Sequence, residues 1–506
     1  MKSKLTLLLF FVLAGLFAQA QGQGRVFDVR TYGATGDGKT LDTQAINKAI
    51  DAAAQAGGGT VFFKAGTYLS YSIHMKSNIS LFIDQGATIL AADSSLYDAA
   101  EPNDFIKYQD FGHGHFHNSL IWGEHLENIS ILGNGVIYGK GLVREADRRP
   151  VGTGNKAISL RECRNVELRD FTILYGGHFG ILATGCDNMT IDNLKIDTNR
   201  DGMDIDGCKN VKVSNCSVNS PQDDGICLKA DYALGRFKDC EDIVITNCIV
   251  SGYDTGTMLD ATFTHTKNGA LARNPTGRIK FGTESSGGFK NITISNCVFD
   301  FCRGLALETV DGGLLEDVTI TNVTMRNIVN APIFLRLGSR MRSPEGTPIG
   351  ELRRINISNF VVYNADPRYG SIISGIPGHD IQDVKLHDIR IYYQGGGTKE
   401  QAAVEAPEKE NAYPEPNMFG VLPSYGFFIR HVKGLQMDNV EVSYMADDAR
   451  PAFNLFDVKG AEFNNLKAQH AAGVPIFVLK DVTNFSTFRC KDLKDINLEK
   501  LTTKTL

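Results

Sequence analysis

Three aspartates form the first group of side chains whose spacing could do chemistry: Asp201 stands one sequence repeat before the adjacent pair Asp223 and Asp224. Carboxylates crowded into one place repel one another, and this repulsion raises the pKa of at least one of them. One group can then stay protonated as a general acid while another remains ionised as a base, which is what glycoside hydrolysis requires. The same residues could instead be structural turn residues or oxygen ligands of a calcium ion.

Spacing predicts how these aspartates lie. His178, Asp201 and Asp223 each follow the first aliphatic residue of a repeat by twelve residues, so we expect one column on neighbouring coils, roughly 4.8 Å apart. Asp224 should face the other way unless a turn bends the chain. Diagonal placement on neighbouring coils would separate acid and base by the roughly 6.5 to 9.5 Å of an inverting enzyme. The alternative for His178 is a packed coil residue.

Four more residues are candidates for substrate binding. Asp204 lies just beyond Asp201, and Lys229 follows Asp224 closely. Arg278 and Lys280 alternate on one face of a strand, so both could enter a cleft. A uronate carboxylate is bound by a bidentate Arg or by the point charge of a Lys. The alternative for this basic pair is a solvated surface position.

These side chains need a scaffold, and the chain repeats a short strand-like segment: Asn or Asp, an aliphatic residue, any residue, and a second aliphatic. One such strand cannot bury its apolar face alone, but stacked repeats share a core. The strand-like pattern excludes helical repeats, the turn residues disfavour a leucine-rich horseshoe, and the shortest intervals are too short for a propeller blade. We therefore predict an all-β, right-handed parallel β-helix, a solenoid. The clearest copies begin at Asn128, Asn165, Asn188, Asn210, Asp242, Asn291, Asp317, Arg354 and Asp383.

The repeated turn residues have a structural interpretation of their own. Stacked Asn side chains satisfy one another's polar groups, so Asn165, Asn188, Asn210 and Asn291 are expected to form a ladder. The ends of a solenoid need caps. Residues 42–56 have helical apolar spacing and precede three glycines, which predicts a helix that covers the N-terminal end.

The N-terminal stretch has the order of a secretory signal peptide: a positively charged start, an apolar run over residues 5–17, and small residues after it. The run is shorter than the roughly 20 apolar residues of a transmembrane helix. We expect a signal peptide over residues 1–20 and a single catalytic domain over residues 21–506. The protein is then secreted or periplasmic, without membrane insertion.

Composition narrows the partners. The formal net charge of −6 argues against nucleic acid, because such binders carry a basic excess. Ten cysteines are an even number that export would allow to pair, but we favour buried thiols because several lie beside the repeats. None has the close paired spacing of a zinc site. We expect no metal and no cofactor, and a monomer.

Two segments around the aspartates read Asn199-Arg200-Asp201-Gly202 and Gln222-Asp223-Asp224. They resemble the Asn-Thr-Asp-Gly and Gln-Asp-Asp motifs of glycoside hydrolase family 28, which contains polygalacturonases and rhamnogalacturonan hydrolases. Residues 26–34 and 57–61 resemble the opening of that family. The resemblance implies that Asp223 protonates the leaving oxygen, while Asp201 and Asp224 activate the attacking water.

The chain also departs from the family pattern. Arg200 replaces the Thr, and no Gly-His-Gly motif follows Asp224; His113 and His115 precede the site and are expected in a loop. The family's Arg-Ile-Lys motif, which binds a substrate carboxylate, appears as Arg278-Ile279-Lys280. In a second register, slightly favoured by the residues that follow, its position falls near Ala306-Leu307-Glu308, without the basic pair.

The sequence therefore predicts a pectin-degrading, inverting hydrolase that cleaves α-linkages of galacturonic acid in a polysaccharide or oligosaccharide. A rhamnogalacturonan hydrolase or an exo-acting galacturonidase is the alternative within the family, because the substrate motifs are altered. A calcium-dependent pectate lyase is disfavoured by the adjacent Asp223-Asp224 pair without a carboxylate-rich loop. A non-catalytic β-helix adhesin would have no reason to collect carboxylates at matching positions.

Overall fold

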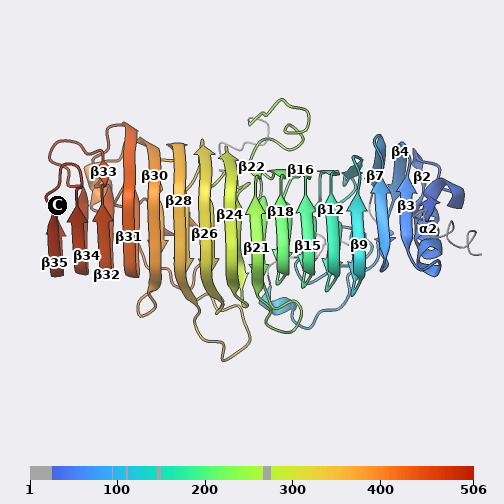
Figure 1. The fold of residues 1–506 in the computed structure, drawn as a ribbon, viewed down its shortest axis with the longest axis horizontal. Coiled ribbons are helices and arrows are strands. Elements are labelled where there is room, and N and C mark those ends of the chain that lie inside the picture. Colours follow the sequence, from blue (N-terminus) through green and yellow to red (C-terminus); the bar gives the residue numbers. More distant parts are fainter. Residues whose placement is uncertain (1–24, 94, 110–111, 145–149, 266–274) are drawn as a thin grey trace, which may run out of the picture.

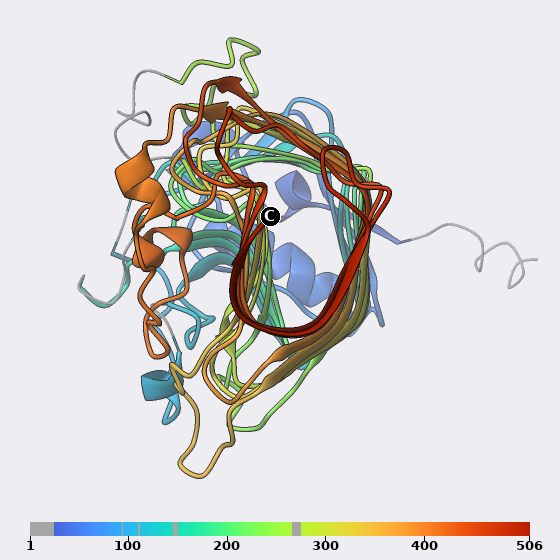
Figure 2. The same cartoon turned by 90° about the vertical axis from the view of Figure 1, so that its left-hand side faces the viewer.

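The computed structural model describes residues 25–93, 95–109, 112–144, 150–265 and 275–506. Its strands stack in consecutive coils along one long axis, from the blue N-terminal end to the red C-terminal end (Figure 1). Viewed along that axis, the coils enclose one continuous interior (Figure 2). The described chain is a parallel β-helix, as the repeats predict. The signal peptide predicted over residues 1–20 lies outside the described residues.

Three ladders of parallel strands line the coil. The first contains the repeat strands: β1 (Val26–Asp28), β3 (Gly59–Phe63), β6 (Ile79–Ile83), β9 (Glu127–Leu132), β12 (Arg164–Arg169), β15 (Asp187–Asp192), β18 (Lys209–Ser214), β21 (Cys240–Thr246), β24 (Phe289–Asp300), β26 (Leu314–Arg326), β28 (Glu351–Ala365), β30 (Ile381–Gly395), β31 (Phe427–Ala446), β32 (Phe453–Asn464) and β34 (Phe477–Phe488).

The second ladder contains β2 (Asp37–Leu41), β4 (Gly66–Ser70), β7 (Ala87–Ala91), β10 (Val136–Tyr138), β13 (Thr172–Leu174), β16 (Lys195–Asp197), β19 (Ser217–Asn219), β22 (Ile249–Ser251) and β33 (Lys467–Ala468). From β24 onward the long strands bend through both ladders. The third ladder contains β5 (Ile73–His74), β8 (Ser119–Glu124), β11 (Lys156–Arg161), β14 (Phe179–Thr184), β17 (Asp201–Asp206), β20 (Ile226–Ala230), β23 (Ile279–Ser285), β25 (Leu305–Thr309), β27 (Ile333–Leu337) and β29 (Ser371–Ser374), and then the start of β31.

The register of the first ladder follows the repeats. Val166 pairs with Ile129 and Met189, and Met189 pairs in turn with Val211. These aliphatic side chains point into the coil and are buried there. Each burial contributes favourable free energy because apolar surface leaves water, on the order of 1.5–3 kcal/mol for a side chain of this size. The repeats therefore fix both the coil and the alignment of its strands.

The predicted Asn ladder is present. The side-chain amide of Asn165 donates to the Asn128 carbonyl oxygen at 2.9 Å, Asn188 donates to Asn165 at 3.1 Å, and Asn210 donates to Asn188 at 2.8 Å. Asn291 continues the row on Asp242 Oδ1 at 2.7 Å. All of these residues have left-handed backbone angles, which Asn and Asp tolerate better than other residues. Their role is structural.

Both ends of the coil are covered. Helix α2 (Thr43–Gln55) lies over the N-terminal end and buries Ala45, Ile46, Ala49, Ile50 and Ala53, as its spacing predicts (Figure 1). The last strand, β35 (Ile496–Thr505), turns back antiparallel to β34 at the other end, where no cap was predicted. The remaining short helices lie in loops: η1 (Val29–Tyr32), η2 (Ile106–Tyr108), α4 (Lys399–Ala402) and η3 (Pro416–Phe419).

All ten cysteines lie in the described part of the chain, and each is a buried free thiol. The preference for buried thiols over disulfides is confirmed. Along the described residues, none of the helices combines the length and the apolar character that crossing a bilayer needs.

Candidate active site

The turns that lead into the third ladder position the aspartates, and these turns differ in length. The turn between β13 and β14 contains four residues, 175–178, whereas the turn between β16 and β17 contains only three, 198–200. The register of β17 with β20 shows that the next turn again contains four, residues 220–223. The coil of Asp201 is therefore one residue tighter than its neighbours.

This difference corrects the predicted column. Asp201 pairs with Phe179 on one side, and the register of the next coil places it opposite Asp224 on the other. The prediction that His178, Asp201 and Asp223 share one column is therefore wrong, because it assumed turns of equal length. Asp224 takes the position beside Asp201, and Asp223 lies one residue back, in the turn.

The three aspartates nevertheless meet. One carboxylate oxygen from each of Asp201, Asp223 and Asp224 lies within 4.8 Å of the other two. The separation of roughly 6.5 to 9.5 Å that was expected between acid and base refers to whole carboxyl groups and not to their nearest oxygens, so it stays a prediction. The reason for the close approach of the oxygens is the in-register placement of Asp201 and Asp224 on adjacent coils, together with a cation that holds Asp201 and Asp223 together.

That cation is Arg200. One guanidinium nitrogen lies 3.0 Å from Asp201 Oδ2 and the other lies 2.9 Å from Asp223 Oδ2. Burial disfavours the charged guanidinium, but the two aspartates outweigh that effect and raise the pKa of Arg200 above its usual value. Arg200 is therefore a permanent positive charge between two of the three carboxylates. The sequence marked it only as a departure from the family motif.

Asp224 is held from the other side by two buried cations. Arg278 Nε donates to Asp224 Oδ1 at 2.9 Å, and Lys280 Nζ lies 3.5 Å from Asp224 Oδ2. Burial by itself raises the pKa of Asp224, but Lys280 and Arg278 outweigh it and hold this pKa well below its usual value. Asp224 is therefore a carboxylate at any pH at which the protein works.

Asp201 has the opposite tendency. Burial, reinforced by the charges of Asp223 and Asp204, raises the pKa of Asp201 well above that of an ordinary aspartate. Asp201 and Asp224 are thus neighbours whose environments drive their pKa values apart. Such a pair holds one proton between two carboxyl groups, which is a common basis for acid–base chemistry.

A buried polar network lies behind the cluster. Asp204 Oδ2 shares a hydrogen bond of 2.9 Å with His113 Nε2 and lies 3.9 Å from Lys229, which pairs with Glu284 at 2.9 Å. Burial raises the pKa of Asp204 to about 8 and lowers that of His113 to about 4. Lys229 and Asp204, both predicted as substrate contacts, are thus engaged with protein groups, and that role stays a prediction.

Arg278 and Lys280 have further partners, so the solvated-pair alternative is wrong: their side chains are 2% and 1% exposed. Arg278 also pairs with Glu415, and Lys280 lies 3.5 Å from Glu308 and 5.4 Å from the centre of the Tyr413 ring. The literal Arg-Ile-Lys motif lies at the start of β23, one coil after Asp224. The segment of the second register lies on β25, one coil further on, where Ala306 is the strand partner of Lys280. Arg278 and Lys280 therefore lie beside Asp224. Substrate binding by them stays a prediction.

His178 is buried and packs against the Phe179 ring at 4.4 Å between centroids. Its Nδ1 contacts the backbone oxygen of Arg144. Burial, with the charge of Arg200, lowers the pKa of His178 well below its usual value, so the ring is neutral. These contacts favour the alternative that His178 is a packed residue of the coil. Substrate binding by His178 stays a prediction.

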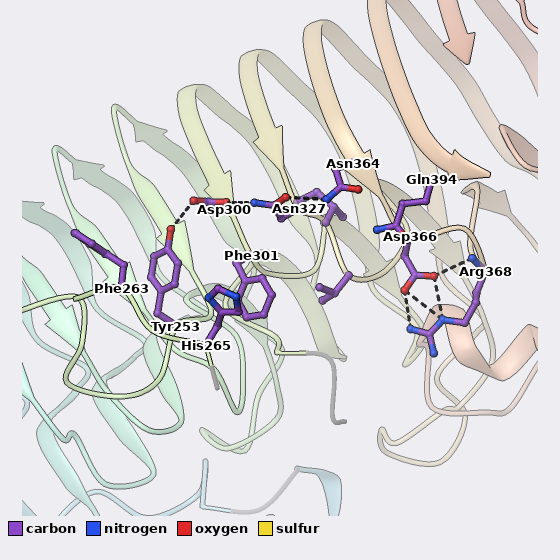
Figure 3. A pocket seen from close by; sticks show the side chains of 12 residues that line it. Tyr253, Phe263, His265, Asp300, Phe301, Asn327, Asn364, Asp366, Arg368 and Gln394 are labelled. Atoms are coloured by element: carbon purple, nitrogen blue, oxygen red, sulfur yellow. Dashed lines mark hydrogen bonds and ion pairs between the residues drawn. The ribbon is translucent and has the colours of Figure 1, made fainter. Parts of the chain in front are cut away.

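A separate hollow of about 720 Å³ lies over the turns that follow the second ladder (Figure 3). Asn364 donates to Asn327 at 2.9 Å and Asn327 to Asp300 at 3.2 Å, while Tyr253 lies nearly parallel to Phe301. None of the three aspartates lines this hollow. The carboxylate chemistry is therefore not located in it.

Several residues of the cluster were missed at the sequence level. Glu415 and Tyr413 come from the loop between β30 and β31, more than a hundred residues after Asp224, so no local spacing linked them to the site. Glu284 and Glu308 lie on β23 and β25, one or two coils after Asp224. Their position facing outward at successive coils is a signal that the repeat pattern could have provided.

Comparison with known proteins agrees with the fold described above. Residues 26–173 match a family model described as rhamnogalacturonase A/epimerase, pectate lyase-like. Residues 128–345 match one described as a right-handed β-helix region, which confirms the predicted handedness.

Three relatives are informative. A probable polygalacturonase of Vitis vinifera is 23% identical over 422 residues, which cover 78% of this chain and 80% of that protein. An exo-poly-α-D-galacturonosidase of Dickeya chrysanthemi is 27% identical over 274 residues, 43% of either chain. The solved family 28 exopolygalacturonase of Yersinia enterocolitica superimposes with a TM-score of 0.64 at 19% identity and covers 94% of this chain and 80% of that one, so the fold is shared.

Proposed function

The chain is a glycoside hydrolase of family 28, and on that premise we propose that it cleaves α-linked galacturonic acid in pectin with inversion of configuration. The observation that carries the proposal is the convergence of Asp201, Asp223 and Asp224 at the start of the third ladder, in a cluster whose carboxyl groups differ in their tendency to hold a proton. Relatives named as polygalacturonases support the substrate class.

The three aspartates take separate roles. Asp223 is the general acid: its side chain is 27% exposed, the most accessible of the three, so it is the carboxylate that a glycosidic oxygen can reach first. Asp224 is ionised and accepts the proton of the attacking water. Asp201, which tends to keep its proton, lies beside Asp224 and orients that water by a hydrogen bond.

Arg278 and Lys280 stabilise the ionised form of Asp224 and do not bind the substrate directly. Arg278 and Lys280 keep Asp224 ionised, and they are too buried and too fully paired to meet a uronate without first losing a carboxylate partner. Asp204, Lys229 and His178 are buried behind the three aspartates and support the structure of the site.

The same cations favour hydrolysis over the calcium-dependent lyase. Each of Arg200, Arg278 and Lys280 lies within 3.5 Å of at least one of the three aspartates. Their positive charge neutralises the carboxylates that a calcium ion would need as oxygen ligands. A divalent cation bound here would be repelled by three protein cations.

An exo-acting galacturonidase is a second candidate, favoured by the similarity to the Dickeya exo-enzyme. The hydrolysis of a rhamnogalacturonan backbone is a third, to which the description of the first family model points. We further propose that residues 1–20 are a signal peptide and that the enzyme acts outside the cytoplasm, where the proposed substrate, a cell-wall polymer, is found. We also propose that it is a monomer.

Product analysis tests these proposals together. The purified protein should release saturated galacturonides from homogalacturonan, faster than any product from a rhamnogalacturonan backbone, and the new reducing end should first appear as the inverted anomer by NMR. Activity should survive exhaustive chelation. Unsaturated uronates that require added calcium would establish a lyase, and a protein that binds pectin without releasing product would establish an adhesin.

A further inference from the structure

Arg200 and Asp223 form the accessible edge of the site. The Arg200 side chain is 18% exposed and that of Asp223 is 27% exposed, whereas Arg278, Lys280 and Asp224 are at most 3% exposed. A sugar that approaches the cluster therefore meets this ion pair before it meets any other charged group of the cluster. Arg200 is also the cation among these that has open surface for a ligand.

The ion pair is at odds with the chemistry of the site as it stands. While the pair is intact, Asp223 Oδ2 lies 2.9 Å from the guanidinium of Arg200, so that oxygen is engaged with the protein and not with a leaving group. The same guanidinium also lies 3.0 Å from Asp201, so it holds two of the three carboxylates together. Both features trace to one side chain, Arg200.

We propose that Arg200 is the receptor for the carboxylate of the galacturonic acid residue at the cleaved bond, and that this carboxylate displaces Asp223 from the guanidinium. The inference rests on the proposed function. A uronate offers the same planar, two-oxygen group as an aspartate, so it can take the place of Asp223 on the guanidinium nitrogen that now contacts Asp223 Oδ2. A methyl-esterified or neutral sugar has no charge to offer and leaves the pair intact.

The exchange supplies the acid and makes room for water. Asp223, no longer paired with Arg200, takes a proton from solvent and gives it to the glycosidic oxygen as the bond to the sugar breaks; water adds to the sugar carbon and loses its proton to Asp224. The charged or titratable groups that face Asp223 are Arg200, Asp201, Asp204, Asp224 and Tyr413. Of these, Arg200 is the ion-pair partner that a bound uronate can take over.

Substrate charge separates this role from a structural one. For the wild type, kcat/KM should be higher on de-esterified than on fully methyl-esterified galacturonan oligomers. Arg200→Thr, which restores the family residue, should lose about ten- to a hundredfold in kcat/KM on the charged oligomer, as removal of a charge-assisted hydrogen bond does. The ratio of kcat/KM on the charged oligomer to kcat/KM on the methyl ester should fall by the same factor, whereas a purely structural role would lower both values together.

Arg303→Thr is the matched control. Arg303 is similarly exposed at 22% and pairs with a carboxylate, Glu415, but contacts none of the three aspartates. Its loss should affect both oligomers equally. A melting curve accompanies each variant; if Arg200→Thr does not fold, Arg200→Lys takes its place, since one ammonium cannot reproduce the fork and KM on the charged oligomer should still rise.

Equal losses on both oligomers in the Arg200 variant would overturn the inference while leaving the hydrolase intact. A wild type that hydrolyses neither oligomer would overturn the proposed function instead. A preserved preference for the charged oligomer in Arg200→Thr would assign uronate recognition to another cation.

Discussion

The asparagine ladder and the catalytic turns are built by the same stacking but behave differently. In the ladder, Asn128, Asn165, Asn188 and Asn210 occupy equivalent positions on four coils, and each of the last three bonds to the residue below it. In the turns before the third ladder, the number of residues changes from four to three and back to four. The Asn ladder therefore repeats the same residue on every coil, whereas the turns before the third ladder differ in length and in sequence from coil to coil.

This difference shows how a solenoid can carry chemistry. A side chain that is identical on every coil pairs with its own copy, and its polar groups are then satisfied within the row. A coil that is one residue tighter breaks the row, so unlike side chains such as Asp201, Asp224 and Arg200 come together and cannot form a ladder. Their unequal environments then separate their pKa values.

The largest effect should come from the accessible aspartate. Asp223→Asn keeps the shape of the side chain but cannot donate the proton, so kcat should fall by roughly 10²- to 10⁴-fold, the usual contribution of a general acid. Asp201→Asn should be comparably severe, since it disturbs the water. Steady-state rates on homogalacturonan measure both. A folded Asp223→Asn protein with near-normal turnover would contradict the mechanism.

The next effect concerns the buried cations. Arg278→Ala removes the buried cation that Asp224 and Glu415 share and leaves them only Lys280 and Arg303, so the free energy of unfolding should fall by up to roughly 3–5 kcal/mol, the cost of breaking a buried ion pair. Denaturant unfolding measures that loss. Arg303→Ala removes a partly exposed partner of the same Glu415 and should cost about 1 kcal/mol or less. Similar losses in the two variants would show that Arg278 is not the structural support of the base.

The sequence predicted the parts of the molecule that depend on repetition. The coil, the pairing of Val166 with Met189 and Val211, the ladder and the α2 face all follow from local periodicity. The column failed because one missing turn residue shifts the later positions of its own coil, and no local pattern marks which of the turns in that coil is the short one. Glu415 was missed because a long loop brings it back to Arg278, and such a contact leaves no periodic trace.

The pH dependence of stability should reveal the network behind the cluster. The pKa of Asp204, raised to about 8 by burial, exceeds its value of about 3.9 in the unfolded chain, so its contribution to stability is full below the lower value and is lost as pH rises toward the higher. The pKa of His113, lowered to about 4, acts in the opposite sense between about 4 and 6.5. Lys229, Glu284, Asp223 and Asp224 also face Asp204.

Together these shifts predict a stability that is nearly level up to about pH 6.5 and falls from there toward pH 8, by at most about 1.4 kcal/mol per pH unit. Asp204→Asn keeps the contact with His113 but cannot ionise. Its stability should therefore rise up to about pH 6.5 and then stay level. Urea unfolding across this range compares the two curves, and parallel curves would show that Asp204 does not titrate there.

The smallest effect belongs to the ladder and should leave catalysis untouched. Asn210→Ala removes one hydrogen bond to Asn188, worth about 1 kcal/mol, and puts at a backbone φ of 56° a residue without the polar side chain that lets Asn tolerate this conformation, which adds about 1 kcal/mol of strain. Asn210→Gly also loses the bond but relieves the strain, so the difference between the two variants measures the backbone contribution. Both should keep the wild-type kcat, because the registers of β15 with β18 and of β17 with β20 are set by buried aliphatic rows on the same coils. A fall in kcat in either variant, at a temperature where the protein is folded, would mean that the ladder positions the catalytic turns as well as the coil, and that the two flanks are not independent.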